Sequence, residues 1–425
     1  MTQPAPAPAR FATHAAVTFA GLMGANVLGY LFYAIVSRVL GVEAYGSFSS
    51  IMAVVLMLSA PALIGQLVVA KLATDLTQDP DRLAALVRGV ERISLAVSLC
   101  AGAALAIASV PLAGFLRVDD PLLVTFAGAS LCGALALPFL RGVLQGTSSF
   151  AAFALSNVAE NAAKARFAPV RGLVGGSRGA MGGVALAYAA ATLYTLMRAR
   201  PRRPKSTITF PLRGVARDSV GVALAVFCIN VLLLYDVVLA KRYLDPYTAG
   251  LYGAAALSSR TLFSVIAFVP TVLLPQVAMR SARAERTRFL FLQAACVAGA
   301  IAAAAVGFFA LFPDFVITVI AGKKFALGAP LLLPYIVAIA ALSVANVIAT
   351  YNIARGRLGF VIPLACVCAG EIVAVVLRHR TAADLLMTIC VGHSLVLLAS
   401  ATSLGGKTRP AVPATEPVSE VEIVR

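Results

Sequence analysis

The chain alternates between long apolar blocks and short polar breaks. Most blocks run for about 20 to 28 residues, the length that an α-helix needs to cross the hydrocarbon core of a bilayer. The pattern therefore predicts an all-α integral membrane protein with about twelve transmembrane helices. These are expected near residues 12–37, 46–72, 86–112, 121–140, 148–168, 180–198, 218–242, 249–276, 288–312, 327–352, 358–378 and 383–404.

The fifth of these helices is the least regular. Its stretch FALSNVAENAAKARFAPV carries Glu160, Lys164 and Arg166. A helix of this polarity does not suit a lipid-facing position, but it suits one that faces protein or a wet cavity.

Composition places the chain outside the soluble globular class. It is 60% hydrophobic and 12% charged with a mean hydropathy of +0.91, against roughly half apolar and a quarter charged in soluble domains. The net charge of +17 invites a nucleic-acid interpretation. However, Lys and Arg lie in the breaks between apolar blocks, and no soluble segment is long enough for a nucleic-acid module. We expect membrane lipids as partners, and no nucleic acid.

The distribution of positive charge orients the helices. The N-terminus, the even-numbered connections and the tail carry about 22 of the 35 Lys and Arg, against about 10 in the odd-numbered connections. Cytoplasmic loops are the richer ones in membrane proteins. Both termini are therefore predicted to be cytoplasmic, in a multi-pass protein of the cytoplasmic (inner) membrane.

The most basic segment follows the sixth helix and divides the chain. It predicts an N-terminal six-helix bundle over residues 1–198, a basic cytoplasmic linker over 199–217 and a C-terminal six-helix bundle over 218–404. The linker is expected to contact anionic lipid headgroups. The tail, 405–425, lacks apolar periodicity and is predicted to be disordered.

Sequence signals for chemistry are lacking. All seven cysteines lie inside apolar blocks without CxxC spacing, and Cys366 and Cys368 point to different faces of one helix. No GxxxxGK[ST] phosphate-binding motif is present. The N-terminus has no short apolar region before a cleavage site, so the first block is expected to be retained. We expect no catalytic residue, no metal and no cofactor.

A short motif recurs at equivalent points of the two halves. After the first helix the chain reads SRVLGVEAYGSFSS and after the seventh KRYLDPYTAGLYGA, which share R-x-L-x5-G-x-aromatic. The matched residues are Arg38, Leu40, Gly46 and Phe48 in the first half and Arg242, Leu244, Gly250 and Tyr252 in the second. A second echo, RGVL at 141–144 and RGRL at 355–358, follows the fourth and tenth helices.

Equivalent helices of the two halves run in the same direction, which predicts a parallel repeat about an axis along the membrane normal. Two such pseudo-symmetric bundles can rock about a central site, as alternating access requires. The alternative is chance recurrence of Arg at membrane interfaces.

The stretch YLFYAIVSRVLGVEAYGSFSSIMAVVLMLSAPALIGQ resembles the opening of the polysaccharide (O-antigen) flippase family. This family belongs to the multidrug/oligosaccharidyl-lipid/polysaccharide exporter superfamily, with the MATE transporters and lipid II flippases. LRGVLQGTSSF (140–150) and YDVVLAKRYLDPYTAGLYGAA (235–255) carry the resemblance further, over roughly residues 12–400. It implies two six-helix bundles in a V that move a lipid-linked glycan to the outer leaflet, together with polysaccharide assembly machinery.

A polyprenyl-pyrophosphate glycan needs a cationic contact within the membrane. Arg260, about eleven residues into its helix, is the first candidate because a guanidinium matches phosphate oxygens. The alternative is an interhelical bond to a carbonyl or to Asp236. Arg38 and Arg242 are further candidates at the outer interface, where the repeat also indicates matched structural roles and snorkelling costs little.

Buried acids are candidates for ion coupling. Glu371 lies deep in the eleventh helix, and Asp236 lies in the outer part of the seventh. A structural bond to a neighbouring helix is the alternative for Glu371. Glu160 and Lys164 stand four residues apart, the spacing that favours an intramembrane ion pair.

Three other functions are open at this level. A multidrug exporter of the same superfamily would be expected to use acids in its cavity, but residues 11–72 contain only Glu43. A polytopic glycosyltransferase usually needs a larger extramembrane segment or a carboxylate cluster; Asp119 and Asp120, the adjacent outer acids, suit a helix cap instead. A purely structural scaffold is the third.

Overall fold

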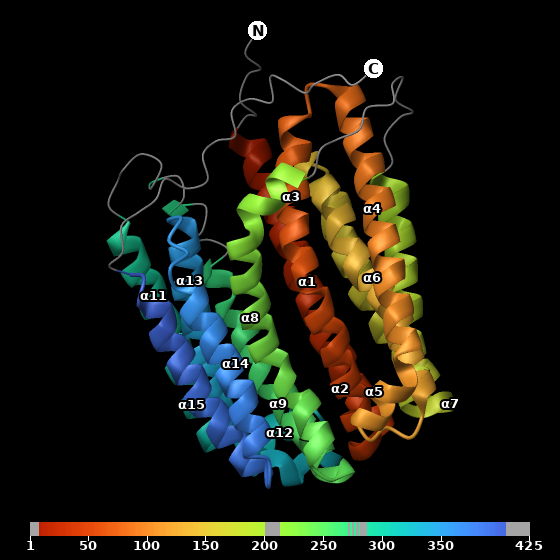
Figure 1. Cartoon of the computed structure of the whole chain (residues 1–425), viewed down its shortest axis with the longest axis vertical. Helices are drawn as coiled ribbons and strands as arrows, with labels where there is room; N and C mark the ends of the chain where they lie inside the picture. The colour runs from red at the N-terminus through yellow and green to blue at the C-terminus, as the bar shows by residue number, and fades with distance from the viewer. Residues whose placement is uncertain are drawn as a thin grey trace. The chain divides into compact units, whose positions relative to one another are not determined.

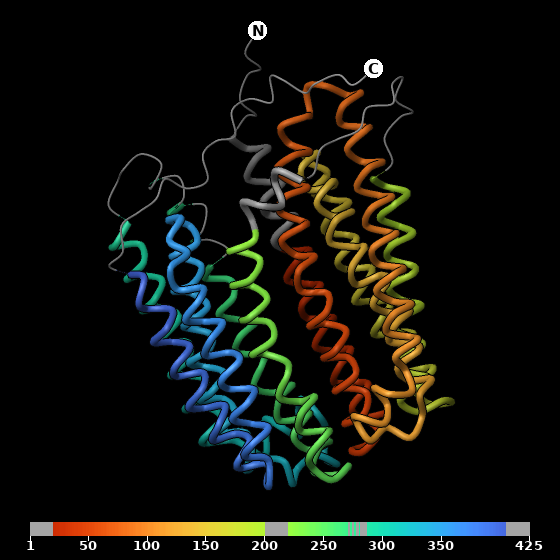
Figure 2. Tube along the Cα trace, in the orientation of Figure 1, coloured from red at the N-terminus to blue at the C-terminus, as the bar shows by residue number. Residues whose placement is uncertain are grey.

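The computed structural model describes residues 8–199, 213–270 and 287–404, together with 273, 276, 277 and 280. These residues form α-helices, one 3-10 helix and short connections, without a strand. The helices are α1 (Pro8–Leu40), α2 (Val42–Ser59), α3 (Pro61–Asp75), α4 (Pro80–Ile107), α5 (Ser109–Phe115), α6 (Pro121–Gly146), α7 (Phe150–Ala199), α8 (Arg213–Tyr243), α9 (Pro246–Ile266), α11 (Arg288–Leu311), α12 (Pro313–Ile320), η1 (Lys323–Leu331), α13 (Leu332–Ala354), α14 (Val361–Leu377) and α15 (Ala382–Ala401). Figures 1 and 2 trace this order.

The predicted all-α membrane fold is confirmed. Ten helical segments of the described chain are long and apolar enough to cross a membrane, and the shorter α14 is apolar as well. One of the ten, α7, contains two helices, so the order agrees with twelve spans. The linker 199–217 lies largely outside the described residues, and the tail 405–425 lies wholly outside them.

Helix α7 reverses direction in the middle of its 50 residues. Gly176 has φ 58° and ψ −144°, a non-helical conformation that favours glycine. Beyond the turn the two arms pack closely, because a Cβ at Gly183 would lie 2.5 Å from the Cα of Ala168. The GG pair at 175–176 thus separates the predicted fifth and sixth helices, and the polar fifth helix is a regular helix.

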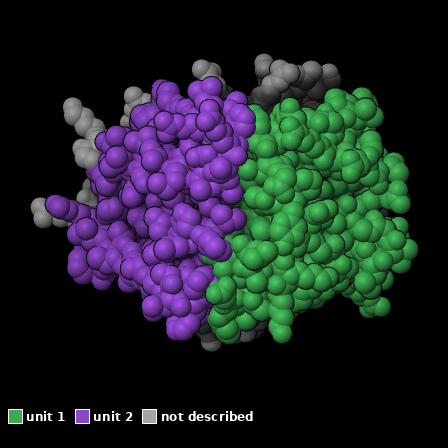
Figure 3. Space-filling model, turned by 90° about the horizontal axis from the view of Figure 1, so that it is seen from below, with its two compact units in different colours: residues 1–215, 234–257, 314–329 green, residues 216–233, 258–313, 330–425 purple. Residues whose placement is uncertain are grey.

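The described chain divides into two compact units (Figure 3). The first comprises Met1–Val215, Leu234–Leu257 and Asp314–Ala329; the second comprises Ala216–Leu233, Ser258–Pro313 and Pro330–Arg425. Neither unit is a single continuous stretch of sequence.

Helix α6 lies at the centre of the first unit and packs against α2, α3, α4, α5 and α7. Small residues permit these close approaches: a Cβ at Gly142 would lie 2.5 Å from the carbonyl oxygen of Gln66, and one at Gly146 would lie 2.3 Å from that of Ala70. Within lipid, where apolar burial gives helices little reason to associate, such backbone contact favours helix pairing.

In the second unit, α13 packs against α11 and α15, and α15 also packs against α14. The order of elements echoes the first half, since the span α4 is followed by the short α5 and the span α11 by the short α12. This order agrees with the internal repeat predicted from the sequence motif.

The two motif glycines of the repeat meet inside the first unit. A Cβ at Gly46 would lie 2.9 Å from the backbone nitrogen of Gly250, and one at Gly250 would lie 2.1 Å from the carbonyl oxygen of Val42. The motif aromatics Phe48 and Tyr252 are both fully buried. Helices α2 and α9 therefore touch backbone to backbone where the motif requires a residue without a side chain.

Asp245 caps the start of α9. Its carboxylate accepts hydrogen bonds from the backbone nitrogens of Tyr247 (3.1 Å) and Thr248 (3.0 Å). A hydrogen bond from the Thr248 side chain, followed by these backbone bonds, lowers the pKa of Asp245. A carboxyl with a lowered folded pKa stabilises the fold above its unfolded pKa and loses that contribution as the pH falls through the folded value.

We expect Asp245→Ala to reduce stability by about 0.5–2 kcal/mol at neutral pH, as loss of a helix cap does. The difference from the wild type should shrink in acid, because the wild-type carboxyl then becomes protonated too. Thermal unfolding midpoints in detergent at neutral and acid pH check this. A difference that does not depend on pH would contradict the role of the ionised carboxylate.

Candidate functional site

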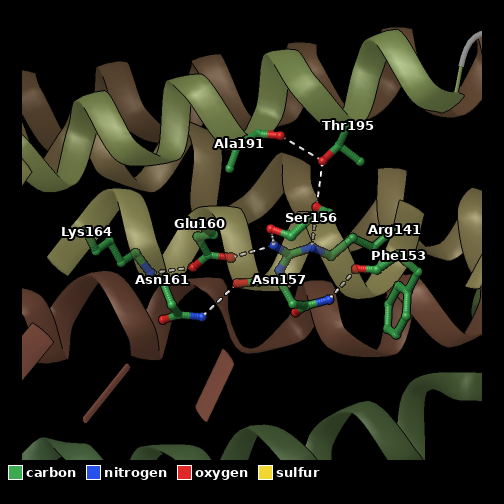
Figure 4. A network of polar contacts seen from close by, with 9 residues as sticks. All are labelled: Arg141, Phe153, Ser156, Asn157, Glu160, Asn161, Lys164, Ala191 and Thr195. Atoms are coloured by element: carbon green, nitrogen blue, oxygen red, sulfur yellow. Dashed lines mark hydrogen bonds and ion pairs between the residues drawn. The ribbon is translucent and has the colours of Figure 1, made fainter. Parts of the chain in front are cut away.

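A buried ionic network lies within the first unit (Figure 4). Arg141 of α6 donates to Glu160 of α7 at 2.7 Å, to the Ser156 hydroxyl at 3.0 Å and to the Ser156 carbonyl at 2.9 Å. Lys164 pairs with the other carboxylate oxygen of Glu160, and its ammonium lies 3.9 Å from the centre of the Tyr188 ring. Two cations thus share one anion.

The three charged residues of this network are at most 8% exposed. The two carboxylate oxygens of Glu160 each have a cation, and the Ser156 hydroxyl also bonds to Thr195 of the second arm of α7 at 2.7 Å. The network therefore ties α6 and both arms of α7 together rather than presenting charge to a ligand. Glu160 and Lys164 do meet, as their spacing predicts. Arg141 was not expected there; the sequence pointed to it only as the first residue of the RGVL echo.

The repeat arginines contact the short helices. Arg38 donates to the carbonyl oxygens of Val319 (2.6 Å) and Ile320 (3.2 Å), the last residues of α12. The guanidinium of Arg242 lies 5.3 Å from the ring centre of Phe115, the last residue of α5. Arg38 of the first half thus contacts α12, which follows the third span of the second half. Arg242 of the second half contacts α5, which follows the third span of the first half. A cation at a helix C-terminus is favourable, which suits the contact of Arg38 with α12, and the contact of Arg242 with Phe115 is a cation–π interaction.

Asp236 is buried on α8, where its exposed fraction is 2%. Its carboxylate accepts a hydrogen bond from the Tyr252 hydroxyl at 3.1 Å. Tyr252 is the motif aromatic of the second half, so Asp236 is connected to the repeat.

Arg260 lies in the membrane-spanning part of α9, within the second unit. Its guanidinium donates to the hydroxyl of Tyr335 on α13 at 3.2 Å. The residue is only partly buried. The phenol hydroxyl accepts this hydrogen bond and so orients the guanidinium.

Glu371 of α14 lies beside His393 of α15. The Glu371 Oε1 and the His393 Nε2 are 3.5 Å apart, and each side chain is only 1% exposed. His393 was missed at the sequence level because a lone histidine in an apolar block gives no signal by itself. Only the packing of α14 on α15 brings it to the predicted acid.

Within the described chain, no group of three or more His, Cys, Asp or Glu could hold a metal ion. The described polar contacts among the spanning helices include the Arg141 network and Asp236–Tyr252 in the first unit, and Arg260–Tyr335 and Glu371–His393 in the second.

The sequence comparisons gave no match, either to the protein-family models or to the curated proteins. Solved structures do share the fold. An inward-facing multidrug resistance MATE family transporter of the MOP superfamily aligns with a TM-score of 0.67 at 15% identity, covering 88% of this chain and 92% of that one. The lipid II flippase MurJ, in an inward closed conformation, aligns with a TM-score of 0.66 at 12% identity, covering 90% and 86%.

A MOP superfamily transporter from Pyrococcus furiosus, described as having a binding pocket of reverse polarity, aligns with a TM-score of 0.50 at 15% identity, covering 90% of this chain and 91% of that one. The chain thus has the fold of MOP superfamily transporters over most of its length. These three solved structures are transporters.

Proposed function

We propose that this protein is a membrane transporter that flips a lipid-linked oligosaccharide, carried on a polyprenyl pyrophosphate, across the cytoplasmic membrane by alternating access. Its fold supports the transport class, since it is similar to a lipid II flippase and to MATE transporters. The R-x-L-x5-G-x-aromatic repeat supports two bundles able to rock about a central site.

The observation that carries the substrate class is Arg260. A lipid-linked glycan presents a pyrophosphate, which requires a cation where the headgroup crosses the hydrocarbon. Arg260 offers a partly exposed guanidinium in a membrane-spanning helix, oriented by Tyr335 at 3.2 Å. A guanidinium fork matches phosphate oxygens in geometry and stays charged at any physiological pH.

We expect Arg260→Ala to reduce flipping of the lipid-linked glycan at least about ten-fold, as the loss of a charged hydrogen bond worth about 1.5–3 kcal/mol predicts. Arg260→Lys should keep part of the activity, because a point charge lacks the fork. The measurement is the leaflet distribution of lipid-linked glycan in cells, or its rate of flipping in proteoliposomes.

Arg178→Ala is the matched control. Arg178 pairs with Asp120 at 3.3 Å on the surface, so its loss removes an arginine without touching α9. Wild-type flipping by a folded Arg260→Ala protein would contradict the anion contact.

A multidrug exporter is the second candidate, favoured by the similarity to a MATE family transporter. The scarcity of acids between residues 11 and 72 counts against binding of organic cations there. Deletion of the gene distinguishes the two. A flippase mutant accumulates lipid-linked glycan on the cytoplasmic leaflet, whereas an exporter mutant changes drug sensitivity with flipping intact.

The proposal includes cytoplasmic termini and contact with polysaccharide assembly machinery. The excess of Lys and Arg in the N-terminus, the even-numbered connections and the tail supports this orientation. Reporter fusions at residues 404 and 380, on opposite sides of the last helix, test it directly.

A further inference from the structure

Two arginines stand side by side in the tight turn that follows α13 in the second unit. Helix α13 ends at Ala354, and the turn is the RGRL echo, with Arg355 and Arg357 on either side of Gly356. Gly356 has φ 65°, which favours glycine. The backbone nitrogen of Arg357 donates to the carbonyl oxygen of Asn352 at 2.9 Å and closes the turn. The backbone therefore holds both arginines at the end of a membrane-spanning helix.

The start of α11 holds the phenol that orients Arg355. The Nη1 of Arg355 donates to the Tyr351 hydroxyl at 3.1 Å, and the guanidinium lies 5.8 Å from the centre of that ring. The same hydroxyl bonds to the Thr287 hydroxyl at 3.0 Å, and the ring stacks on Phe291 with 4.5 Å between the ring centres. Tyr351 and Thr287 are 3% and 1% exposed. Arg355 thus has a buried and well-held partner.

Arg357 is held by the end of α15. Its Nη1 donates to the carbonyl oxygens of Leu404 at 2.5 Å and Ser403 at 3.4 Å. Burial, followed by the charge of Arg355, lowers the pKa of Arg357, but a guanidinium stays charged at physiological pH all the same. Two positive charges therefore lie near each other, and the groups that they contact are a phenol and two carbonyls, which are all neutral.

Both guanidiniums keep one edge without an acceptor. Their hydrogen bonds use Nη1 in each case. The Nε atoms of Arg355 and Arg357 are buried without a hydrogen-bond partner among the described residues, and the ion pairs of those residues include neither arginine. A buried charged donor without an acceptor is unfavourable. Each residue as a whole is only partly buried, so an acceptor can approach the edge formed by Nε and Nη2.

The matching arginine of the first half is in a different position. Arg141 lies inside α6, which continues to Gly146, and its guanidinium bonds to the carboxylate of Glu160 and to Ser156. Arg355 lies beyond the end of its helix and bonds to a phenol. The first copy of the echo therefore has its anion within the protein, whereas the second copy presents a fork that an external anion can fill.

We infer that Arg355 and Arg357 bind the phosphate group of a lipid through their Nε–Nη2 edges. A guanidinium fork matches phosphate oxygens in geometry. The spanning helices α13 and α15 both end at this turn, which is the depth at which lipid phosphates lie. With cytoplasmic termini, this is the cytoplasmic interface, whose leaflet carries anionic lipids; this orientation rests on the proposed function.

Two lipids offer this chemistry. One is an anionic phospholipid of the cytoplasmic leaflet, and the other is the pyrophosphate of the lipid-linked glycan before it crosses. In the second case the turn would bind the substrate on the side from which it is flipped, before its headgroup reaches Arg260. The chemistry of recognition is the same for both, so binding experiments must distinguish them.

Positive charge after a helix is favourable without any ligand, through the helix dipole and the orientation of the chain in the membrane. Both of these effects depend on charge alone, so lysine would serve as well as arginine. A phosphate site predicts a further loss when the charge is kept and the fork is removed. Arg355→Lys separates the two explanations.

Lipid binding can be measured without transport. Native mass spectrometry of the purified protein in an uncharged detergent gives the affinity for two probes, phosphatidylglycerol and farnesyl pyrophosphate. We expect saturable binding of at least one probe by the wild type. Arg355→Gln and Arg357→Gln should bind that probe at least about ten-fold more weakly, as the loss of a charged hydrogen bond predicts. Arg355→Lys should also bind more weakly than the wild type.

Arg82→Gln is the matched control. It removes an arginine from the same predicted side of the membrane, but Arg82 is 45% exposed and pairs with Asp79 at 3.2 Å. Its affinity for both probes should equal that of the wild type. If Arg355→Gln and Arg357→Gln bind as tightly as Arg82→Gln, the site is overturned. Wild-type affinity in Arg355→Lys would refute recognition by the fork, and this variant keeps the charge, so it gives a readout even where a Gln variant fails to fold.

The two probes identify the source of the phosphate. Tighter binding of phosphatidylglycerol supports a resident phospholipid, and tighter binding of farnesyl pyrophosphate supports the substrate headgroup. The site and the proposed function can fail separately. A protein that binds a probe through Arg355 but flips no glycan would contradict the proposed function and support the site. Glycan flipping by a protein that binds neither probe would contradict the site alone.

Discussion

Replacing Glu160 with Gln is expected to lower the stability of the folded protein by about 3–5 kcal/mol. The change leaves Arg141 and Lys164 buried at 8% and 5% exposure without the anion that they share. Breaking one partner of a buried ionic set is far more harmful than replacing the whole set, because it strands charge in a low-dielectric region. Thermal unfolding followed by size-exclusion in detergent measures the effect.

The double variant Glu160→Gln/Lys164→Gln should recover part of the loss, since it removes one stranded cation. Asp120→Asn is the matched control for removal of an acid: its partner Arg178 is 47% exposed, and exposed pairs contribute about 0–1 kcal/mol. An equal loss in Glu160→Gln and Asp120→Asn would show that the network contributes no more than a surface pair.

Gly250→Ala is expected to reduce stability by about 1–3 kcal/mol, the usual cost of overpacking. The added Cβ would lie 2.1 Å from the carbonyl oxygen of Val42 and 2.7 Å from its Cγ1. The carbonyl belongs to the backbone of α2, so the two helices must separate to relieve the clash. The thermal unfolding midpoint, measured as for Glu160→Gln, reports the loss.

Gly299→Ala is the control for this substitution, because a Cβ on that α11 glycine would meet nothing within 4 Å. Alanine favours a helix over glycine, so this variant should be neutral or slightly stabilised. If Gly250→Ala behaves like Gly299→Ala, the contact between α2 and α9 is looser than the structure has it.

The fold could be predicted largely from the sequence because the length of the apolar blocks identifies the membrane-spanning helices. A helix that crosses hydrocarbon needs a long apolar block, and nearly every such block became a helix close to its expected limits. The division of α7 was visible in the glycines around residue 176. Short elements were not predicted: α5 and α12 are too brief to show a period, and their ends depend on contacts with other helices.

The site was predicted only in part. Glu160 and Lys164 were found because their spacing on one helix dictates that they meet. Arg141 and His393 required knowledge of which helices pack together, which local sequence does not contain. The repeat was visible in the sequence as a motif, but the sequence did not show why the motif contains a glycine in each half. Gly46 and Gly250 are needed because they touch each other, a contact between residues about two hundred positions apart.

The first unit is built from three stretches that are far apart in the sequence, so it cannot be completed until late in translation. Its last segment, Asp314–Ala329, is far along the chain, and it supplies the carbonyls that Arg38 contacts. Arg38 is synthesised early, and the carbonyls that it contacts are synthesised only after most of the later helices. During translation the surface of α2 around Gly46 is likewise without its partner until α9 arrives. A ribosome paused between residues 199 and 234 should therefore hold an incomplete first unit, open to insertion chaperones and membrane proteases.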